Sequence, residues 1–128
     1  MFTDIRVYPE RTVLASIKGD IDHHTAKSIR SDIDRTISDC DPKLLILDFS
    51  EVTFMDSSGI GLVMGRYKLM TERGGEVIIS EPAGYIRKVF QLSGIDKLTK
   101  IVSDPGRYLK EDSDTVSKEE QTNEAKAY

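Results

Sequence analysis

Phe54-Met55-Asp56-Ser57-Ser58-Gly59-Ile60-Gly61 joins two predicted elements of this chain. The apolar run Leu44-Leu45-Ile46-Leu47 precedes it, and an amphipathic stretch from Ile60 to Met70 follows. This order predicts a buried strand that leads through a short acidic loop into the first turn of a helix. The backbone N–H groups at a helix start are unpaired and carry roughly half a positive charge, so the place where Ser57 and Ser58 fall favours a phosphate.

The flanking sequence repeats this alternation of strand and helix. Residues 2–8 and 12–17 alternate in polarity around a turn at Pro9-Glu10, which predicts a hairpin. A first helix follows, with one apolar face formed by Ala26, Ile29, Ile33 and Ile37. The second helix is expected to start at Ser57 or Ser58 and to run to Arg73, with an inward stripe of Ile60, Val63, Met64, Tyr67 and Met70.

The C-terminal half continues the pattern. A strand is predicted over 77–79, a third helix after Pro82, and a last strand over 98–102. The expected inward residues of the third helix are Ile86, Val89, Phe90 and Leu92. The order β-β-α-β-α-β-α-β predicts an α/β domain with a mostly parallel mixed sheet of about four to five strands. Helices would pack against this sheet, and the first strand would form an antiparallel edge.

The 128 residues fit one domain, which we place at residues 1–109. Residues 110–128 are polar and contain almost no apolar side chain besides Val116. Such a segment cannot bury enough apolar surface to offset its ordering entropy, so we expect a disordered tail.

Composition excludes several classes of function. The net charge is −4 without a basic patch, which argues against nucleic acid as a partner. The single cysteine, Cys40, cannot form an internal disulfide, and this suits a reducing, cytoplasmic compartment. No signal peptide is visible, and no apolar run approaches the roughly 20 residues that span a membrane.

Two predicted strand-to-helix loops, residues 20–25 and 56–61, are expected to meet at one end of the sheet. They would bring together Asp20, Asp22, His23, His24, Asp56, Ser57 and Ser58. The simplest interpretation of Asp56 and Ser57 is a helix cap worth about 1 kcal/mol, which is compatible with an anion-binding role. Gly59 and Gly61 each cost about 1 kcal/mol relative to alanine, which suggests that something approaches the backbone closely there.

Catalytic and metal sites are not expected. Met55 stands where a nucleophile elbow needs glycine, and the adjacent His23 and His24 lack the spacing of zinc ligands. A receiver-like domain remains an alternative, because Leu45-Ile46-Leu47-Asp48 reads as a strand ending in a phospho-accepting aspartate. That chemistry also needs an acidic pair for Mg²⁺ after the first strand, and none is placed there.

Four blocks together resemble the anti-sigma-factor antagonists of the bacterial STAS-domain family, over about residues 2 to 103. They are Asp22-His23-His24-Thr25-Ala26, the segment 54–61, Gly65-Arg66-Tyr67-Lys68 and Gly74-Gly75-Glu76. The first and third blocks are most similar to the sporulation branch, which antagonises the anti-sigma-F factor. The family usually closes with an apolar C-terminal helix, from which Pro105-Gly106 and the polar tail depart.

The resemblance implies a regulator and not an enzyme. Unphosphorylated, it would bind an anti-sigma factor that is also a serine kinase, and so release a sigma factor. The kinase would use ATP to phosphorylate Ser57, and a serine phosphatase would reverse this, so the chain itself needs no cofactor. The implied partner surface comprises Asp20, Asp22, His23, His24, Thr25, Asp56, Ser57, Ser58, Gly59, Ile60, Gly61 and Met64. We expect a monomer when free; a STAS module for nucleotide binding or scaffold assembly is the remaining alternative.

Overall fold

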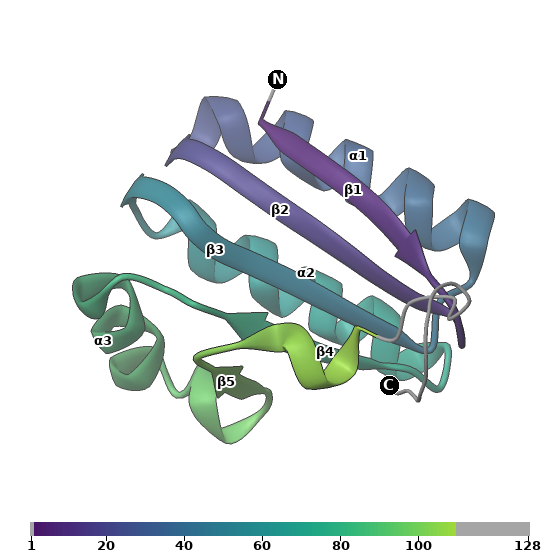
Figure 1. Ribbon diagram of the computed structural model, residues 1–128. Helices are drawn as coiled ribbons and strands as arrows, with labels where there is room; N and C mark the ends of the chain where they lie inside the picture. Colours follow the sequence, from purple (N-terminus) through teal and green to yellow (C-terminus); the bar gives the residue numbers. More distant parts are fainter. Residues whose placement is uncertain (1, 110–128) are drawn as a thin grey trace.

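Within residues 2–109, which the computed structural model describes, five strands form one mixed sheet in the order β1-β2-β3-β4-β5 (Figure 1). They are β1 (Thr3–Tyr8), β2 (Thr12–Ile21), β3 (Leu44–Met55), β4 (Glu76–Ser80) and β5 (Lys100–Val102). β1 pairs with β2 antiparallel, and every other pairing is parallel. The predicted mixed sheet with an antiparallel N-terminal edge is therefore confirmed. The predicted boundary after residue 109 and the tail 110–128 lie outside the described residues.

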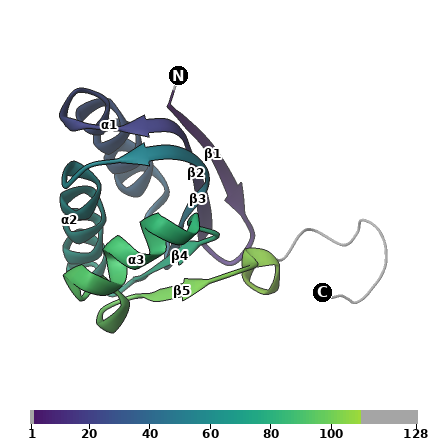
Figure 2. The ribbon, with the colours of Figure 1, turned by 90° about the vertical axis from the view of Figure 1, so that its left-hand side faces the viewer.

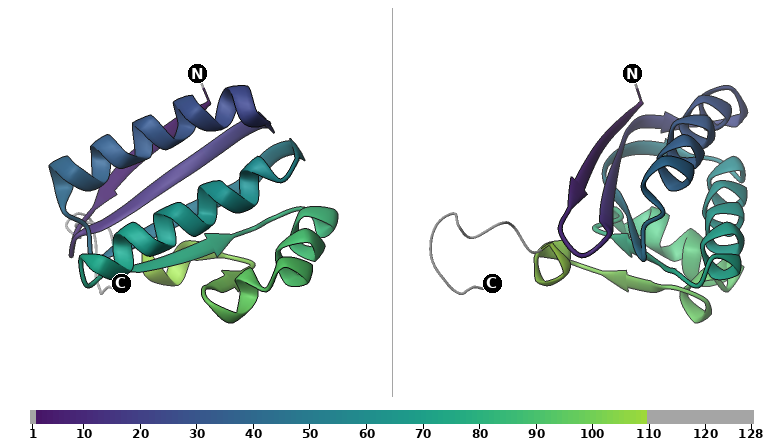
Figure 3. Two further views of the ribbon diagram at one scale, coloured as in Figure 1. Left: turned by 180° about the vertical axis from the view of Figure 1, so that it is seen from behind. Right: turned by 90° about the vertical axis from the view of Figure 1, so that its right-hand side faces the viewer.

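Helices connect the parallel strands in sequence order. They are α1 (His23–Cys40), α2 (Ser58–Glu72) and α3 (Gly84–Ser93), with short 3₁₀ helices η1 (Ile95–Lys97) and η2 (Pro105–Tyr108). α1 and α2 run side by side over the same face of the sheet (Figure 3). This follows from right-handed crossovers between neighbouring parallel strands, which place consecutive helices on one side.

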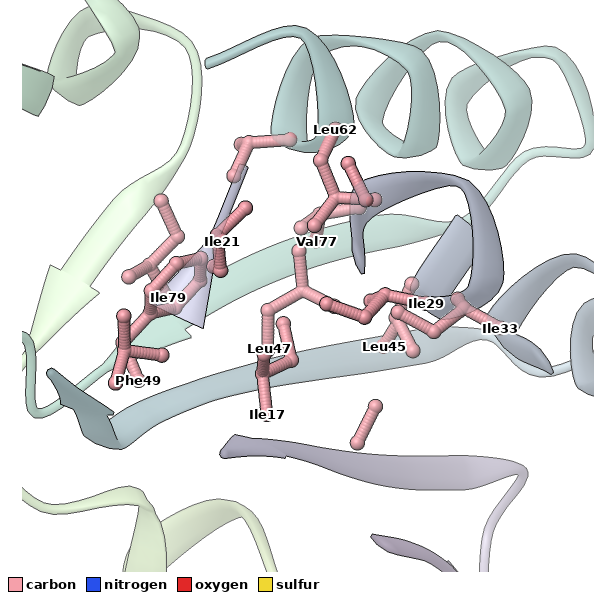
Figure 4. Packing of buried hydrophobic residues seen from close by; sticks show 14 of the residues in the cluster. Ile17, Ile21, Ile29, Ile33, Leu45, Leu47, Phe49, Leu62, Val77 and Ile79 are labelled. Atoms are coloured by element: carbon pink, nitrogen blue, oxygen red, sulfur yellow. The ribbon is translucent and has the colours of Figure 1, made fainter. Parts of the chain in front are cut away.

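The main core lies between this helical layer and the sheet (Figure 4). Alternate residues of β2, β3 and β4 point toward the helices, as the period of two in a strand requires. The predicted inward stripe of α1 is confirmed, since Ala26, Ile29, Ile33 and Ile37 are all buried. Phe49 and Phe90 meet edge to face with ring centroids 5.2 Å apart and so tie α3 to β3.

The inward face of α2 differs from the prediction. Its buried residues are Gly59, Leu62, Val63, Arg66 and Met70, so the predicted stripe is confirmed at Val63 and Met70. Ile60, also predicted to face in, is partly buried and packs against the core. Met64 is 38% exposed. The apolar pattern misled because a glycine and an arginine occupy two inward positions. In α3, Leu92 was expected to face in and is instead 80% exposed.

The opposite face of the sheet is covered by the C-terminal part of the described chain. Ile46 and Ile78 alternate with the residues of the main core and are nevertheless fully buried. η2 lies on this side of the sheet, away from α1 and α2 (Figure 2), and its Pro105 is buried. Within the described residues a short 3₁₀ helix follows β5, in line with the departure at Pro105-Gly106 from the apolar closing helix that is usual in the family.

Candidate functional site at the start of α2

The two strand-to-helix junctions, residues 20–25 and 54–61, lie side by side. Asp20 pairs with Phe54 and Ile21 with Met55 in the parallel register of β2 and β3. The Asp56 N–H then donates to the Ile21 carbonyl at 3.1 Å, just beyond the paired residues. The expected meeting of the two loops is therefore confirmed, because the strands that lead into them end together.

Asp56, and not Ser57, satisfies the backbone at the start of α2. Asp56 Oδ1 accepts a hydrogen bond from the Ser58 N–H at 2.8 Å. Ser57 occupies the N-cap position, but its side chain makes no capping hydrogen bond, and the residue is exposed. The Ser57 carbonyl accepts from the N–H groups of Ile60 and Gly61. The Ser57 hydroxyl therefore faces solvent at the positive end of a 15-residue helix.

The neighbouring junction is held by a reciprocal cap. Asp22 Oδ1 accepts from the N–H groups of His24 and Thr25, both at 2.9 Å, and Thr25 Oγ1 accepts from the Asp22 N–H at 3.0 Å. The Thr25 hydroxyl also donates to the Asp20 carbonyl at 2.8 Å. The backbone hydrogen bond from Thr25 is the main cause that lowers the pKa of Asp22 below its ordinary value. Asp22 and Thr25 thus fix the loop in place.

The two histidines are displayed at the first turn of α1. His23 and His24 are both exposed, and their ring centroids lie 4.1 Å apart. Residues 2–109 contain no group of three or more His, Cys, Asp or Glu side chains arranged to hold a metal ion.

Thr53 and Tyr85 belong to this region and were missed by the sequence reading. The Thr53 hydroxyl donates to Asp20 Oδ1 at 2.8 Å, and the Tyr85 hydroxyl donates to the Thr53 carbonyl at 2.7 Å. These bonds link the ends of β2 and β3 to the first turn of α3. Phe54 and Tyr85 remain 48% and 51% exposed. Since Tyr85 lies 32 residues from Thr53 in sequence, no local pattern could have signalled the contact.

The surroundings of Gly59 and Gly61, in the first turn of α2, differ. A Cβ built on Gly59 would lie 2.2 Å from Met55 Sδ and 2.3 Å from Met55 Cγ, so a buried side chain of the chain itself approaches this backbone. A Cβ on Gly61 would meet nothing within 4 Å. The close approach inferred for Gly59 is therefore internal, whereas an external approach at Gly61 remains a prediction.

A groove of about 340 Å³ opens between α1 and α2 beside Ser58. Its walls include His23, Lys27 and Arg30 of α1 and Ser58, Gly61 and Leu62 of α2. Three of the predicted site residues, His23, Ser58 and Gly61, thus face the same hollow.

The receiver-like interpretation of Asp48 does not fit its placement. β3 continues to Met55, so Asp48 lies inside the strand and not at its end. Its carboxylate accepts hydrogen bonds from the hydroxyls of Ser16 and Ser80, on the neighbouring strands, at 3.2 and 3.4 Å. β3 thus extends well beyond the apolar run Leu44–Leu47 that predicted it, because the mixture of polar and apolar residues over 50–55 concealed its continuation.

None of the helices in residues 2–109 is long and apolar enough to cross a bilayer.

Comparison with known proteins identifies the family. The STAS domain model matches residues 4–106. An anti-sigma F factor antagonist of Lysinibacillus sphaericus is 35% identical over 95 residues, which cover 74% of this chain and 81% of that protein. The unphosphorylated form of the anti-sigma factor antagonist SpoIIAA superposes with a TM-score of 0.72 at 31% identity, covering 83% of this chain and 92% of that chain. The phosphorylated form of SpoIIAA, a Bacillus cell fate determinant, gives a TM-score of 0.67 at 31% identity, covering 83% and 96%. The chain therefore belongs to the STAS-domain family, in its branch of anti-sigma factor antagonists.

Proposed function

We propose that this chain, in its unphosphorylated form, binds an anti-sigma factor that is also a serine kinase and thereby releases a sigma factor. Phosphorylation of Ser57 by that kinase would end the interaction, and a serine phosphatase would restore it. The chain would act in the cytoplasm as a monomer when free, by binding and not by catalysis. The carrying observation is the exposed Ser57 hydroxyl, which makes no capping bond at the start of α2. SpoIIAA, a relative of similar fold, has been described in both an unphosphorylated and a phosphorylated form.

The geometry around Ser57 suits a reversible ester. A phosphate adds a charge of about −1.5 to −2, and a negative charge at a helix N-terminus is favoured by about 0.3–1 kcal/mol. Because Asp56 already caps the Ser58 N–H, modification of Ser57 breaks no hydrogen bond that holds the fold. The phosphorylated domain should therefore stay folded and change only its surface.

The effect of the phosphate would arise in the complex. The proposed partner surface is the set of residues around the two junctions, Asp20, Asp22, His23, His24, Thr25, Asp56, Ser57, Ser58, Gly59, Ile60, Gly61 and Met64. Of these, Gly59 is buried and acts through its backbone, while Met64 is exposed. A phosphate desolvated against the partner would weaken binding, and a loss of about 3 kcal/mol corresponds to more than a hundredfold in Kd.

Site mapping tests the acceptor directly. The chain is incubated with its cognate anti-sigma factor kinase and ATP, and the modified residue is located by mass spectrometry. Wild type and Ser58→Ala should be labelled at residue 57, and Ser57→Ala should not be labelled. Labelling at Ser58 alone would overturn the assignment.

Binding variants test the charge mechanism. Ser57→Asp should bind the ADP-loaded anti-sigma factor more weakly than Ser57→Ala, by less than a full phosphate because aspartate carries about one charge. Both variants should melt within a few degrees of wild type. Equal affinities of the two variants would refute the role of charge.

A further inference from the structure

The groove between α1 and α2 carries positive charge that nothing in the described chain neutralises. Lys27 and Arg30 lie one turn apart on its α1 wall and are exposed. The ion pairs of residues 2–109 involve Arg6, Arg11, Arg35, Arg66 and Arg73, but neither of these two residues. The exposed imidazole of His23 lines the same wall.

A third cation, Arg66, is buried near Lys27 and Arg30. Arg66 of α2 is 6% exposed, and its Nε lies 2.9 Å from Asp34 Oδ1 of α1. Neither Nε nor Nη1 is aligned for a hydrogen bond with any residue in 2–109. Burial lowers the pKa of the Arg66 guanidinium, Asp34 opposes this effect, and the nearby charge of Arg30 adds to it. The charges of Arg30 and Arg66 therefore repel one another, and within residues 2–109 Asp34 is the acid paired with Arg66.

Lys27 and Arg30 share one wall of the groove and have no ion-pair partner among residues 2–109, so an anion that entered from outside would be attracted to both. The position of the groove beside the proposed partner surface indicates the source of such an anion. The groove shares His23, Ser58 and Gly61 with the proposed partner surface, so a protein that reaches Ser57 also covers the groove. An open groove at the edge of such a surface suits side chains of that protein.

We propose that the groove formed by Lys27, Arg30 and Ser58 receives acidic side chains of the anti-sigma factor. This inference rests on the proposed function and names the chemistry of its interface. It also explains why phosphorylation of Ser57 would weaken, and not strengthen, binding of the anti-sigma factor. An acidic segment drawn to this groove would be repelled by a phosphate on Ser57, the residue adjacent to Ser58, and the phosphate would partly neutralise the cations that attract the segment.

The test compares affinities for the ADP-loaded cognate anti-sigma factor by isothermal titration calorimetry. The double variant Lys27→Glu, Arg30→Glu should bind about tenfold more weakly than wild type at low ionic strength. Lys43→Glu is the single-reversal control, because it reverses an exposed lysine in the connection that follows the C-terminal end of α1. It should bind within twofold of wild type. Raising salt from about 0.05 M to about 0.3 M should weaken wild type more than the double variant, since screening acts on the attraction that the variant has lost.

Thermal melting of the variants serves as the control for folding. Removing the charge of Arg30 relieves its repulsion of Arg66, so Arg30→Glu should melt at the wild-type temperature or above it. A double variant that is folded and binds within twofold of wild type overturns the inference while leaving the proposed function intact. Failure of wild type itself to bind overturns the proposed function and the inference with it. Saturable binding of inorganic phosphate by wild type only, with unchanged affinity of the double variant for the partner, would assign the groove to a small anion and also overturn the inference.

Discussion

Replacing the two glycines in the first turn of α2 by alanine should change the stability in opposite directions. At Gly61, a Cβ meets nothing within 4 Å. Gly61→Ala should therefore show the helical advantage of alanine over glycine and stabilise the fold by about 0.5–1 kcal/mol. At Gly59, the added Cβ would overlap Met55, whose side chain is 6% exposed and has little room to move. Overpacking of this kind costs about 1–3 kcal/mol, so Gly59→Ala should be destabilised by about 1–2 kcal/mol after the helical gain.

The assay is urea unfolding followed by far-ultraviolet circular dichroism, because the chain contains no tryptophan. The two variants should differ by about 1.5–3 kcal/mol with unchanged m-values. Gly65→Ala serves as a second control, since its Cβ also meets nothing within 4 Å in the same helix. It should resemble Gly61→Ala.

A double-mutant cycle identifies the cause of the penalty. If Met55 is responsible, Gly59→Ala should cost little or nothing in the background of Met55→Ala, where the overlapping atoms are gone. An undiminished penalty in that background would refute the assignment to Met55. Equal stability of Gly59→Ala and Gly61→Ala in the wild-type background would refute the packing argument altogether.

Three further perturbations test the buried ion pair between α1 and α2, the cap of α1 and the contact of α3. Arg66→Met should leave the unfolding free energy unchanged or raise it, because an apolar side chain often replaces a buried ion pair without loss. Asp34→Asn should lower it by about 1–2 kcal/mol, because the buried guanidinium loses its partner and the partial exposure of Asp34 reduces the effect. Equal effects of the two variants in chemical denaturation would contradict this. The pKa of Asp22 is lowered from 3.8 in the folded state, so its contribution to stability is present above about pH 4 and is lost as the pH falls through the lowered value. Between about pH 5 and about pH 3 the melting temperature of Asp22→Asn should therefore fall less than that of wild type. Parallel curves of melting temperature against pH would argue against this. Tyr85→Phe removes the hydrogen bond to the Thr53 carbonyl and should destabilise the fold by about 0.5 kcal/mol or less. It should also weaken partner binding, measured by calorimetry. Unchanged binding would show that Tyr85 is not part of the partner site.

The order of elements was predictable because each has a local signature. The isoleucines of α1 repeat at helical spacing, and the strand around Leu45 is a short apolar run, so the pattern of α1 and the parallel sheet followed from periodicity alone. The meeting of residues 20–25 with 56–61 was also predictable, since parallel strands place their carboxyl ends at one edge.

Tertiary contacts explain what sequence could not give. The inward face of α2 includes Arg66, which a hydrophobic pattern assigns to solvent and which is buried beside Asp34 of α1. The reason for Gly59 lies in the direction of the Met55 side chain, and the role of Tyr85 depends on α3 lying over the end of β3. The cationic groove likewise appears only when α1 and α2 are placed side by side.

The division of roles between Asp56 and Ser57 is what makes a modification at this helix start compatible with a stable fold. A serine that caps a helix through its own hydroxyl would lose that acceptor geometry when esterified, and the helix would lose about 1 kcal/mol of capping. Here the carboxylate of Asp56 takes the Ser58 N–H, so the Ser57 hydroxyl contributes no bond to the fold. Removing the carboxylate of Asp56 should make the stability of the fold depend on phosphorylation of Ser57. In Asp56→Ala the Ser58 N–H loses its acceptor, and a phosphate on Ser57 should then raise the melting temperature by more than it does in wild type, because it supplies the missing negative charge at the helix start. An equal shift in both backgrounds would show that Asp56 does not separate stability from modification.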